Sequence, residues 1–588
     1  MVSSSRTAIF IQDDCYKHKY IRSKDTSNIV ERPERLKAVK LGLATALSRL
    51  EEVFQPNSGD SSQKDTVADD LVAALDRMKL DSKTNSSFGS VSVFHSSASI
   101  LLLGNPAVKY IHGDIEGDVY LEKVVKWAKE STEKVGRGES EIPEGLPQGD
   151  LYLCPESISA MEGALGTVCE AVDTVITGQV PTPSPSSESS NEQLKRAFVA
   201  VRPPGHHCGE DTPCGFCFVN NVAVGAAHAH LKHGVNRVVI FDIDLHHGNG
   251  TQSIVWGINE ESYRQTLEAE AGAPETKPGL KAYYGSIHDI MSFPCEDGKA
   301  ELIQAASVSI HESHGQWIEN IHLQSYEDEP SFHKLYEDKY SKLINKAEQF
   351  LDATGGPGDD VCGMDASEHE YTSMSRHGRK VPTSFFHRFT ADTCRFADKY
   401  AKGRMISVLE GGYSDRALMS GALAHLCGMV DVPDETLMSE WWRLENLEKV
   451  EKLVKKRRNG RPSGVGTTTD AWVERTGEIF ASMDTAGAAI LAAAVRRAKA
   501  AVPAPTRVLR DRKTKTAEST PTTSPAKKAQ APTVKSEDLS DLSSPPDSDT
   551  DGTEPTGALE GGPIATNLPS KKLPRVILKL GPNPDPGS

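Results

Sequence analysis

The sequence predicts an α/β fold with a single parallel β-sheet that carries helices on both faces, followed by a helical extension and a disordered C-terminal tail. Short apolar runs rich in β-branched residues alternate with longer amphipathic segments, which is typical of parallel sheets with crossover helices. The apolar runs are unbroken, as expected of strands buried on both faces. Beyond residue 500, Pro, Ser, Thr, Asp and Lys dominate and apolar residues are sparse, a composition typical of disorder.

The composition sets limits on compartment and partners. A chain of 588 residues exceeds one compact core, so we expect one large domain with additions. The net charge of -16 argues against general nucleic-acid affinity and suits a basic partner, so we expect no direct sequence-specific binding of nucleic acid. No apolar run approaches the roughly 18 residues that cross a membrane, and the run at 8–11 is too short for a secretory signal. The ten cysteines form no disulfide framework, which favours a reducing compartment.

The N-terminal part begins with a strand at 8–11 and an amphipathic helix that starts near Pro33, a residue suited to the first turn of a helix. Its further elements are an insertion at about 51–115 with one short helical pattern near 67–80, a helix over 115–136, a helix over 158–177 and a strand at 197–201.

The alternation continues through the rest of the main domain. Its elements are a small-residue helix at 221–232, a strand from 238, a second insertion at about 257–280, strands at 282–288, 308–310, 360–366 and 405–413, and helices within 333–352. Beyond about residue 430 come a charged helix that ends in the basic run 455–458 and an Ala-rich helix over 469–500. We therefore expect a main domain at 1–435, a helical extension at 436–500 and a disordered tail at 501–588.

Polar side chains at the end of the strand that starts at Val238 indicate a functional site. Asp242, Asp244 and His246 occupy alternate positions, and side chains two apart in an extended segment point to the same side. Three further predicted strand ends carry unusual polar residues: His206 and His207, Asp365, and Tyr413. Ligands bind beyond the carboxyl ends of parallel strands, so we expect all these residues to meet. The simpler alternative is a solvated strand end with capping aspartates.

The residue types indicate hydrolytic chemistry. Asp244, His246 and Asp365 supply one imidazole and two carboxylates, which suit zinc with an open position and also divalent iron. The adjacent histidines His206 and His207 can serve as general base and acid.

Neighbouring residues supply the remaining parts. Asp242 and Asn249 are available to fix the tautomers of the two histidines, and the Tyr413 hydroxyl can donate to a developing oxyanion. These parts indicate hydrolysis of an amide or an ester. Each also has an ordinary alternative: a loop tyrosine, surface histidines, a helix-capping aspartate. Cys214 and Cys217 could be a redox pair or half of a structural zinc site.

On these residues the sequence resembles the zinc-dependent histone deacetylases of the arginase–deacetylase fold, in a class II-like, fungal branch. The matching motifs, within about residues 5–430, are Arg202-Pro203-Pro204-Gly205-His206-His207, Gly215-Phe216-Cys217-Phe218-Val219-Asn220-Asn221, Asp242-Ile243-Asp244-Leu245-His246-His247-Gly248-Asn249-Gly250-Thr251-Gln252 and Glu410-Gly411-Gly412-Tyr413. Residues 1–435 would then be the catalytic domain.

The resemblance implies a role for each site residue. Zinc would be held by Asp244, His246 and Asp365, and structural potassium by backbone oxygens near 242–246 and 286–287. His207 would be the general base and acid, with His206 as its electrostatic companion. Asp242 would lie behind His206 and Asn249 behind His207. Tyr413 would donate to the acetyl carbonyl, and the substrate-binding residues would be Gly215, Phe216 and Phe293. The two phenylalanines would form the walls of an acetyl-lysine tunnel.

The resemblance also implies hydrolysis of acetyl-lysine amides on histone tails or other acetylated proteins, with release of acetate. Transcriptional repression would follow, with a corepressor complex as a partner. The expected location is the nucleus, and the cytoplasm is the alternative. Two other functions stay open: deacetylation of acetylpolyamines or other small amides, and a non-catalytic scaffold that binds acetyl-lysine or a corepressor. The segment Cys295-Glu296-Asp297-Gly298 departs from the Gly-rich turn usual in the family, which leaves the tunnel rim and peptide selectivity open.

The tail carries candidate regulatory segments. The basic residues Arg510, Arg512, Lys513 and Lys515, together with the run 455–458, predict nuclear import. Val534-Lys535-Ser536-Glu537 resembles a sumoylation acceptor, and Ser543, Ser544 and Ser548 lie among acids and prolines where kinases act. The alternative is a tail that only aids solubility.

Overall fold

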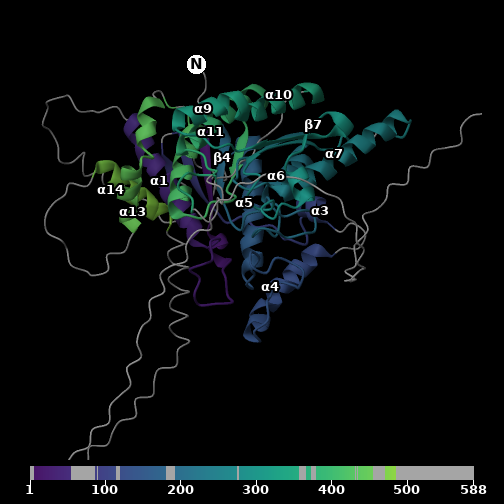
Figure 1. Ribbon diagram of the computed structural model, residues 1–588, viewed down its shortest axis with the longest axis horizontal. Helices are drawn as coiled ribbons and strands as arrows, with labels where there is room; N and C mark the ends of the chain where they lie inside the picture. Colours follow the sequence, from purple (N-terminus) through teal and green to yellow (C-terminus); the bar gives the residue numbers. More distant parts are fainter. Residues whose placement is uncertain are drawn as a thin grey trace, which may run out of the picture. The chain divides into compact units, whose positions relative to one another are not determined.

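In the computed structural model most paired strands run parallel, as the sequence predicts (Figure 1). The structure describes residues 6–54, 86–88, 90–113, 119–179, 193–274, 277–355, 366–371, 379–430, 432, 435–454 and 470–484. These residues belong to one compact unit, Met1–Ala504. The predictions for the helical pattern at 67–80, the strand at 360–365 with Asp365, the basic run at 455–458 and the tail from 501 fall outside the described residues.

The strands pair in two groups. They are β1 Arg6–Gln12, β2 Ser86–Phe88, β3 Val91–Ser96, β4 Leu194–Ala200, β5 Arg237–Asp242, β6 Lys281–His288, β7 Ser309–His311, β8 Trp317–His322 and β9 Met405–Val408. One group has the order β2-β3-β1-β4-β9 and the other β5-β6-β8-β7. Two edge pairs, β2–β3 and β7–β8, are antiparallel, and the other strand pairs are parallel, in agreement with the predicted fold class. The connection 312–316 between β7 and β8 is too short for the crossover that a parallel pair needs.

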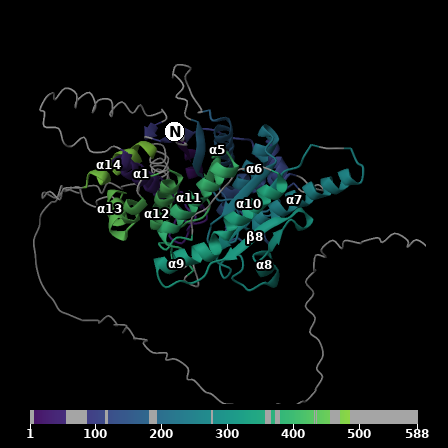
Figure 2. The ribbon, with the colours of Figure 1, turned by 90° about the horizontal axis from the view of Figure 1, so that it is seen from above.

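Helices cover both groups of strands (Figures 1 and 2). They are α1 Glu34–Phe54, α3 Pro106–His112, α4 Tyr120–Gly136, α5 Ser157–Thr177, α6 Asn221–His233, α7 Asn249–Glu270, α8 Ala300–Ala305, α9 Glu329–Leu335, α10 Lys342–Thr354, α11 Thr383–Tyr400, α12 Asp415–Met429, α13 Leu444–Val454 and α14 Ala471–Met483. None of these described helices is long and apolar enough to cross a membrane.

Burial along the strands shows that both faces of the sheets are covered. Every residue of β1 after Arg6 is buried, and so is every residue of β6 after Lys281. Helix α5 packs against β1, β4 and β9, and α10 packs against β5, β6 and β8. The unbroken apolar runs therefore mark strands of the interior, as the sequence predicts.

Part of the expected insertion at 51–115 belongs to the α/β body. Strand β3 pairs in parallel with β1, and its Val91 and Val93 are buried. Helix α3 packs against α6. The structure also adds β8, which the sequence did not predict, and it continues α7 through residue 270 into the segment expected as the second insertion.

The described part of the C-terminal extension packs on α1. Ser48 donates a hydrogen bond to the Trp472 carbonyl over 2.8 Å, and the Arg49 guanidinium lies 3.7 Å from the centre of the Trp472 ring. At the end of α14, Asp484 accepts hydrogen bonds from Tyr16 over 2.8 Å and from Lys40 over 3.2 Å. The extension therefore contributes to the packing of the main domain.

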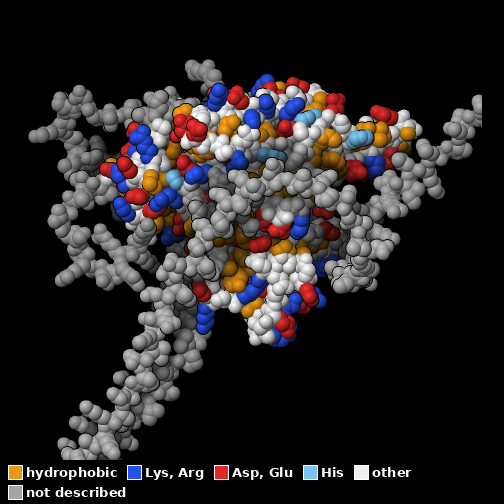
Figure 3. Space-filling view, viewed as in Figure 1, with side chains coloured by type: hydrophobic (Ala, Val, Ile, Leu, Met, Phe, Trp, Pro, Cys, Tyr) orange, Lys and Arg blue, Asp and Glu red, His pale blue; other side chains and the backbone are white. Residues whose placement is uncertain are grey.

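The surface carries charges of both signs. On the face drawn in Figure 3, Lys and Arg side chains are interspersed with Asp and Glu side chains over the described helices. The excess of acids in the sequence is therefore not gathered into one patch on this face.

We predict that Trp472→Ala lowers the free energy of unfolding by about 3–5 kcal/mol, because it empties a buried site between α14 and α1. Trp472 is only 6% exposed. Urea denaturation of the full chain measures the change. Trp256→Ala is the matched control, since Trp256 is 39% exposed and should cost much less. Equal effects of the two substitutions would contradict this packing of α14 on α1.

Candidate active site

The residues predicted from the strand ends meet beyond the carboxyl end of β5. Asp244 is fully buried, and its Oδ1 accepts a hydrogen bond from the His246 backbone N–H over 2.9 Å and lies 3.3 Å from His246 Nδ1. The other oxygen, Oδ2, accepts a hydrogen bond from the Gly411 N–H over 2.8 Å. Asp244 therefore joins the segment after β5 to the loop after β9. Asp365, the third expected metal ligand, lies outside the described residues.

The two adjacent histidines each have the partner that the sequence offered. His206 Nδ1 lies 3.2 Å from Asp242 Oδ2, and His207 Nδ1 lies 2.8 Å from Asn249 Oδ1. The ring centres are 4.0 Å apart. Because Asn249 Oδ1 can only accept, His207 carries its proton on Nδ1 and keeps a lone pair on Nε2.

The surroundings separate the proton affinities of the two rings. Burial holds the pKa of His207 well below its usual value, and the neighbouring His206 and His246 lower it further. Burial also disfavours charge on His206, but Asp244 and Asp242 overcome this and raise its pKa well above the usual value. His206 therefore carries the positive charge, and His207 is the neutral base of the pair.

Glu410 is a functional residue to which the sequence analysis assigned no role. Its Oε2 accepts hydrogen bonds from the N–H groups of Gly205 over 2.6 Å and His206 over 3.1 Å. Burial raises the pKa of this carboxyl to about 7, against the opposing effect of His206. The sequence signal that could have identified Glu410 is its position directly before the Gly411-Gly412-Tyr413 turn. Glu410 holds the histidine loop against the tyrosine loop.

The backbone around Tyr413 is fixed from two sides. Glu370 accepts hydrogen bonds from the N–H groups of Tyr413 and Ser414, each over 2.7 Å. Arg35 donates to the carbonyls of Gly412 and Glu410, each over 2.6 Å, and its guanidinium lies 5.0 Å from the centre of the Tyr413 ring. Tyr413 is 4% exposed, so these contacts hold its ring in the interior of the site.

Two aromatic rings stand beside the catalytic candidates. The Phe293 ring meets His207 edge-on, with centres 4.9 Å apart, and Phe216 lies 5.5 Å from the Tyr413 ring. Gly215 has φ +48°, and a Cβ there would lie 2.4 Å from His207 Cδ2. Only glycine therefore allows this close approach of the backbone to the base.

Comparison with known proteins gives the family. Residues 108–429 match the family model of the histone deacetylase domain. This chain belongs to the histone deacetylase family. It is 33% identical over 442 residues to histone deacetylase HOS3 of Saccharomyces cerevisiae, which covers 72% of this chain and 56% of that protein.

More distant relatives agree. The chain is 29% identical over 311 residues to type-2 histone deacetylase 2 of Dictyostelium discoideum, covering 49% of this chain and 15% of that protein. It is 27% identical over 350 residues to histone deacetylase HDA1 of Candida albicans, covering 57% of this chain and 35% of that protein. The chain thus spans less than two thirds of these relatives. A crystal structure of the HDA15 HD domain matches with TM-score 0.45 and 19% identity, over 82% of this chain and 99% of that one.

Two acids, Asp150 and Glu296, act electrostatically on Cys214, one of two thiols beside Gly215 and Phe216 in the sequence. Burial and the charge of Glu296 raise the pKa of Asp150. Cys214 and Cys217 exchange two backbone hydrogen bonds, of 3.1 and 2.8 Å, and both thiols are free. Burial raises the pKa of Cys214 to about 11, and that of Cys217 as well.

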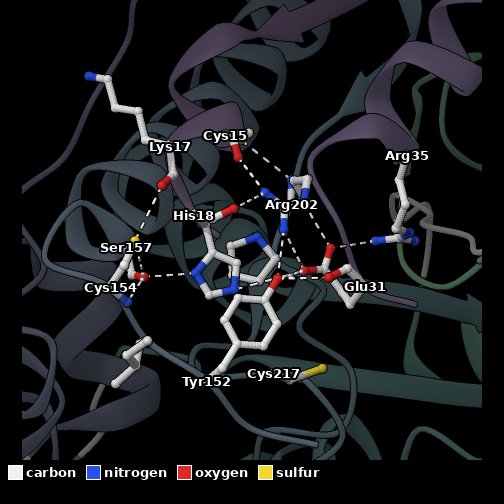
Figure 4. A network of polar contacts seen from close by, with 12 residues as sticks. Cys15, Lys17, His18, Glu31, Arg35, Tyr152, Cys154, Ser157, Arg202 and Cys217 are labelled. Carbon is white, nitrogen blue, oxygen red and sulfur yellow. Dashed lines mark hydrogen bonds and ion pairs between the residues drawn. The ribbon is translucent and has the colours of Figure 1, made fainter. Parts of the chain in front are cut away.

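A buried ion network fixes the deacetylase loops (Figure 4). Glu31 accepts hydrogen bonds from Arg202 over 2.8 and 2.5 Å, from Arg35 over 3.0 Å and from the Tyr152 hydroxyl over 2.6 Å. Arg202 also donates to the carbonyls of Cys15 and His18, each over 2.6 Å. Burial would raise the pKa of Glu31, but Arg202 and Arg35 hold it well below its usual range. The sequence motif that contains Arg202 does not reveal this pairing, because Glu31 is far away along the chain.

We predict that Glu31→Gln lowers the free energy of unfolding by about 3–5 kcal/mol, because it leaves the buried Arg202 and Arg35 without their anion. Denaturant unfolding measures this loss. Glu133→Gln is the control, since Glu133 pairs with Arg137 at the exposed surface and should change stability by about 0–1 kcal/mol. Similar small effects of both substitutions would show that the network contributes little to stability.

Proposed function

We propose that this chain is a zinc-dependent deacetylase that hydrolyses acetyl-lysine amides on histones or other proteins and releases acetate. One observation carries the proposal: the His207–Asn249 pair, the Asp244–His246 edge and the Tyr413 loop come together at one buried point. A base, ligands of the types that zinc prefers and a hydroxyl donor are the parts that amide hydrolysis needs.

The charge balance of the site suits a divalent cation. The carboxylates of Asp242 and Asp244 are both buried, and they raise the pKa of the neighbouring His206. Buried carboxylates are stable only with compensating charge. Asp244 and His246 would hold zinc, with Asp365 as the expected third ligand. Potassium near 242–246 and 286–287 remains a prediction.

When bound, zinc lowers the pKa of a water molecule toward roughly 7 and polarises a carbonyl. His207 Nε2 accepts a proton from the attacking water as the new carbon–oxygen bond forms. It then gives a proton to the lysine nitrogen as the carbon–nitrogen bond breaks, so the products are acetate and the free amine. His206, with Asp242 behind it, keeps its own charge and orients the pair.

The remaining residues orient the substrate. The Tyr413 hydroxyl donates to the carbonyl oxygen, where negative charge develops in the transition state. Phe216 and Phe293 would line the four-carbon stem of the acetylated lysine, which is apolar along its length. The backbone of Gly215 would complete this wall.

The acids Asp150 and Glu296 favour a substrate with positive charge. Glu296 raises the pKa of Asp150, and both acids raise the pKa of Cys214, the residue directly before Gly215. A basic histone tail meets this requirement, and so does an acetylpolyamine, which is why the latter stays the second candidate. The relatives are named histone deacetylases, which supports the histone substrate. A role in the nucleus in transcriptional repression, with a corepressor partner, is part of the same proposal.

The first test of the proposal is metal dependence. Asp244→Ala and His246→Ala should each remove bound zinc, measured by elemental analysis, and abolish deacetylation of an acetylated histone-tail peptide. The same assay with an acetylpolyamine decides between the two substrate classes through the ratio of kcat/KM values. Full turnover by metal-free protein would refute the zinc-dependent mechanism, and would leave the fold and family unaffected.

The second test separates chemistry from metal binding. His207→Ala removes the base and should lower kcat by roughly 10²–10⁴-fold. Tyr413→Phe removes one donor to the oxyanion and should lower kcat by roughly 10²–10³-fold. Both variants should keep their zinc. Tyr110→Phe, at an exposed tyrosine of α3, is the control and should leave kcat unchanged. Loss of zinc from His207→Ala or Tyr413→Phe would contradict the assignment of these two residues to catalysis alone.

A further inference from the structure

Helices α5 and α6 carry three side chains with metal-ligand chemistry, none of which belongs to the active site. Oδ1 of Asp173 lies 2.9 Å from His228 Nε2 and 2.7 Å from His233 Nε2. One ligand atom from each of the three lies within 4.8 Å of the others. A single ion placed between them could therefore contact all three.

The ends of the two helices create this arrangement. Asp173 lies in the last turns of α5, and His233 is the last residue of α6, where Gly234 ends the helix with φ +70°. His228 lies little more than one turn earlier on α6. At about 100° per residue the two histidines leave α6 in different directions. Their rings are 6.1 Å apart at an angle of 72°, so they approach Asp173 from two sides.

The environment keeps the Asp173 carboxylate in the form that binds metal and leaves all three side chains accessible to solvent. The side chains of His228 and His233 are 13% and 14% exposed, and that of Asp173 is 33% exposed, so an ion can enter from solvent. Burial would raise the pKa of Asp173, but hydrogen bonds from His228, Lys232 and His233 hold it well below its usual value. Asp173 is therefore an ionised carboxylate.

Lys232 orients this carboxylate. Its ammonium lies 2.7 Å from Asp173 Oδ2, the oxygen that the histidines do not contact. Such outer contacts fix the orientation of a ligand and leave its other oxygen for the ion. The positive charge of Lys232 also opposes a cation, so this site should be weaker than one without it.

We propose that Asp173, His228 and His233 form a second metal site that binds Zn²⁺ or another divalent cation with a preference for imidazole, with water at the remaining position. Two imidazoles and one carboxylate are a frequent ligand set for such ions. Ligand atoms of tetrahedral zinc are roughly 3.3 Å apart, slightly more than the hydrogen-bond distances in this cluster. In the metal-free protein each ring donates its Nε2–H to Asp173. Ion binding requires that this proton move to Nδ1 and that each ring shift slightly outward, which opens the space. The bound ion ties the C-terminal ends of α5 and α6 together.

Metal stoichiometry and affinity test this site in the full chain. Zn²⁺ titrated into metal-free protein by calorimetry should show one more equivalent in the unsubstituted chain than in His228→Gln or His233→Gln, or an affinity at least about tenfold weaker in these variants. His230→Gln is the matched control, because His230 is on the same helix and contacts the Val235 carbonyl over 2.9 Å instead of Asp173. It should keep the additional equivalent.

The same titration in an Asp244→Ala background separates this site from the active site. One equivalent should remain there, and it should disappear when His228→Gln is added. The melting temperature of each metal-free protein shows that the variants are folded, and added Zn²⁺ should raise it in the His230→Gln control more than in the other two. Equal Zn²⁺ binding by His228→Gln, His233→Gln and the control would overturn the proposal, whatever the active site does.

Discussion

The buried carboxylate of Glu31 is the interaction on which the rest of the site depends. It lies between two buried guanidinium groups, and each of them holds a different loop. Arg202 begins the segment that ends in the histidine pair. Arg35 donates to the carbonyls of Glu410 and Gly412, which precede Tyr413. A buried ion left without its partner costs several kcal/mol, so these loops cannot shift independently without a large penalty. Glu31 thus couples the position of the loop that carries the histidine pair to that of the loop that carries Tyr413.

A second level of organisation is electrostatic. The site gathers three buried carboxylates around His206, which raises the affinity of this ring for a proton while burial lowers that of His207. Two neighbouring residues of one type thereby differ in charge because their surroundings differ. The buried carboxylates of Asp242 and Asp244 are the electrostatic argument for the cation that we propose at the site. The strands position these groups: Asp242 is the last residue of β5, and the others are on loops that follow strands.

The family match begins at residue 108, but the structure shows that earlier residues are part of the same body. Strand β1 lies in the centre of its sheet between β3 and β4, and α1 supplies Arg35 to the tyrosine loop. At the other end, α14 packs on α1 and ends in Asp484, which binds Lys40 and Tyr16. The segments outside the match thus support the helix that in turn supports the active site.

The sequence by itself determined the elements whose signal is local. Alternate polar residues after an apolar run marked Asp242, Asp244 and His246, and the common direction of parallel strands explained why the histidine pair and Tyr413 would join them. Asp365, which was expected to join the same site, lies outside the described residues. The tertiary structure decided what depends on distant partners: the antiparallel edge strands, the place of β3 beside β1, and the roles of Glu31 and Glu410. The partners of these two carboxylates are up to about two hundred positions away along the chain, as with Glu410 and Gly205. No periodicity in a short segment can encode such a pairing, because it is the folding of the whole chain that brings the two groups within hydrogen-bond distance.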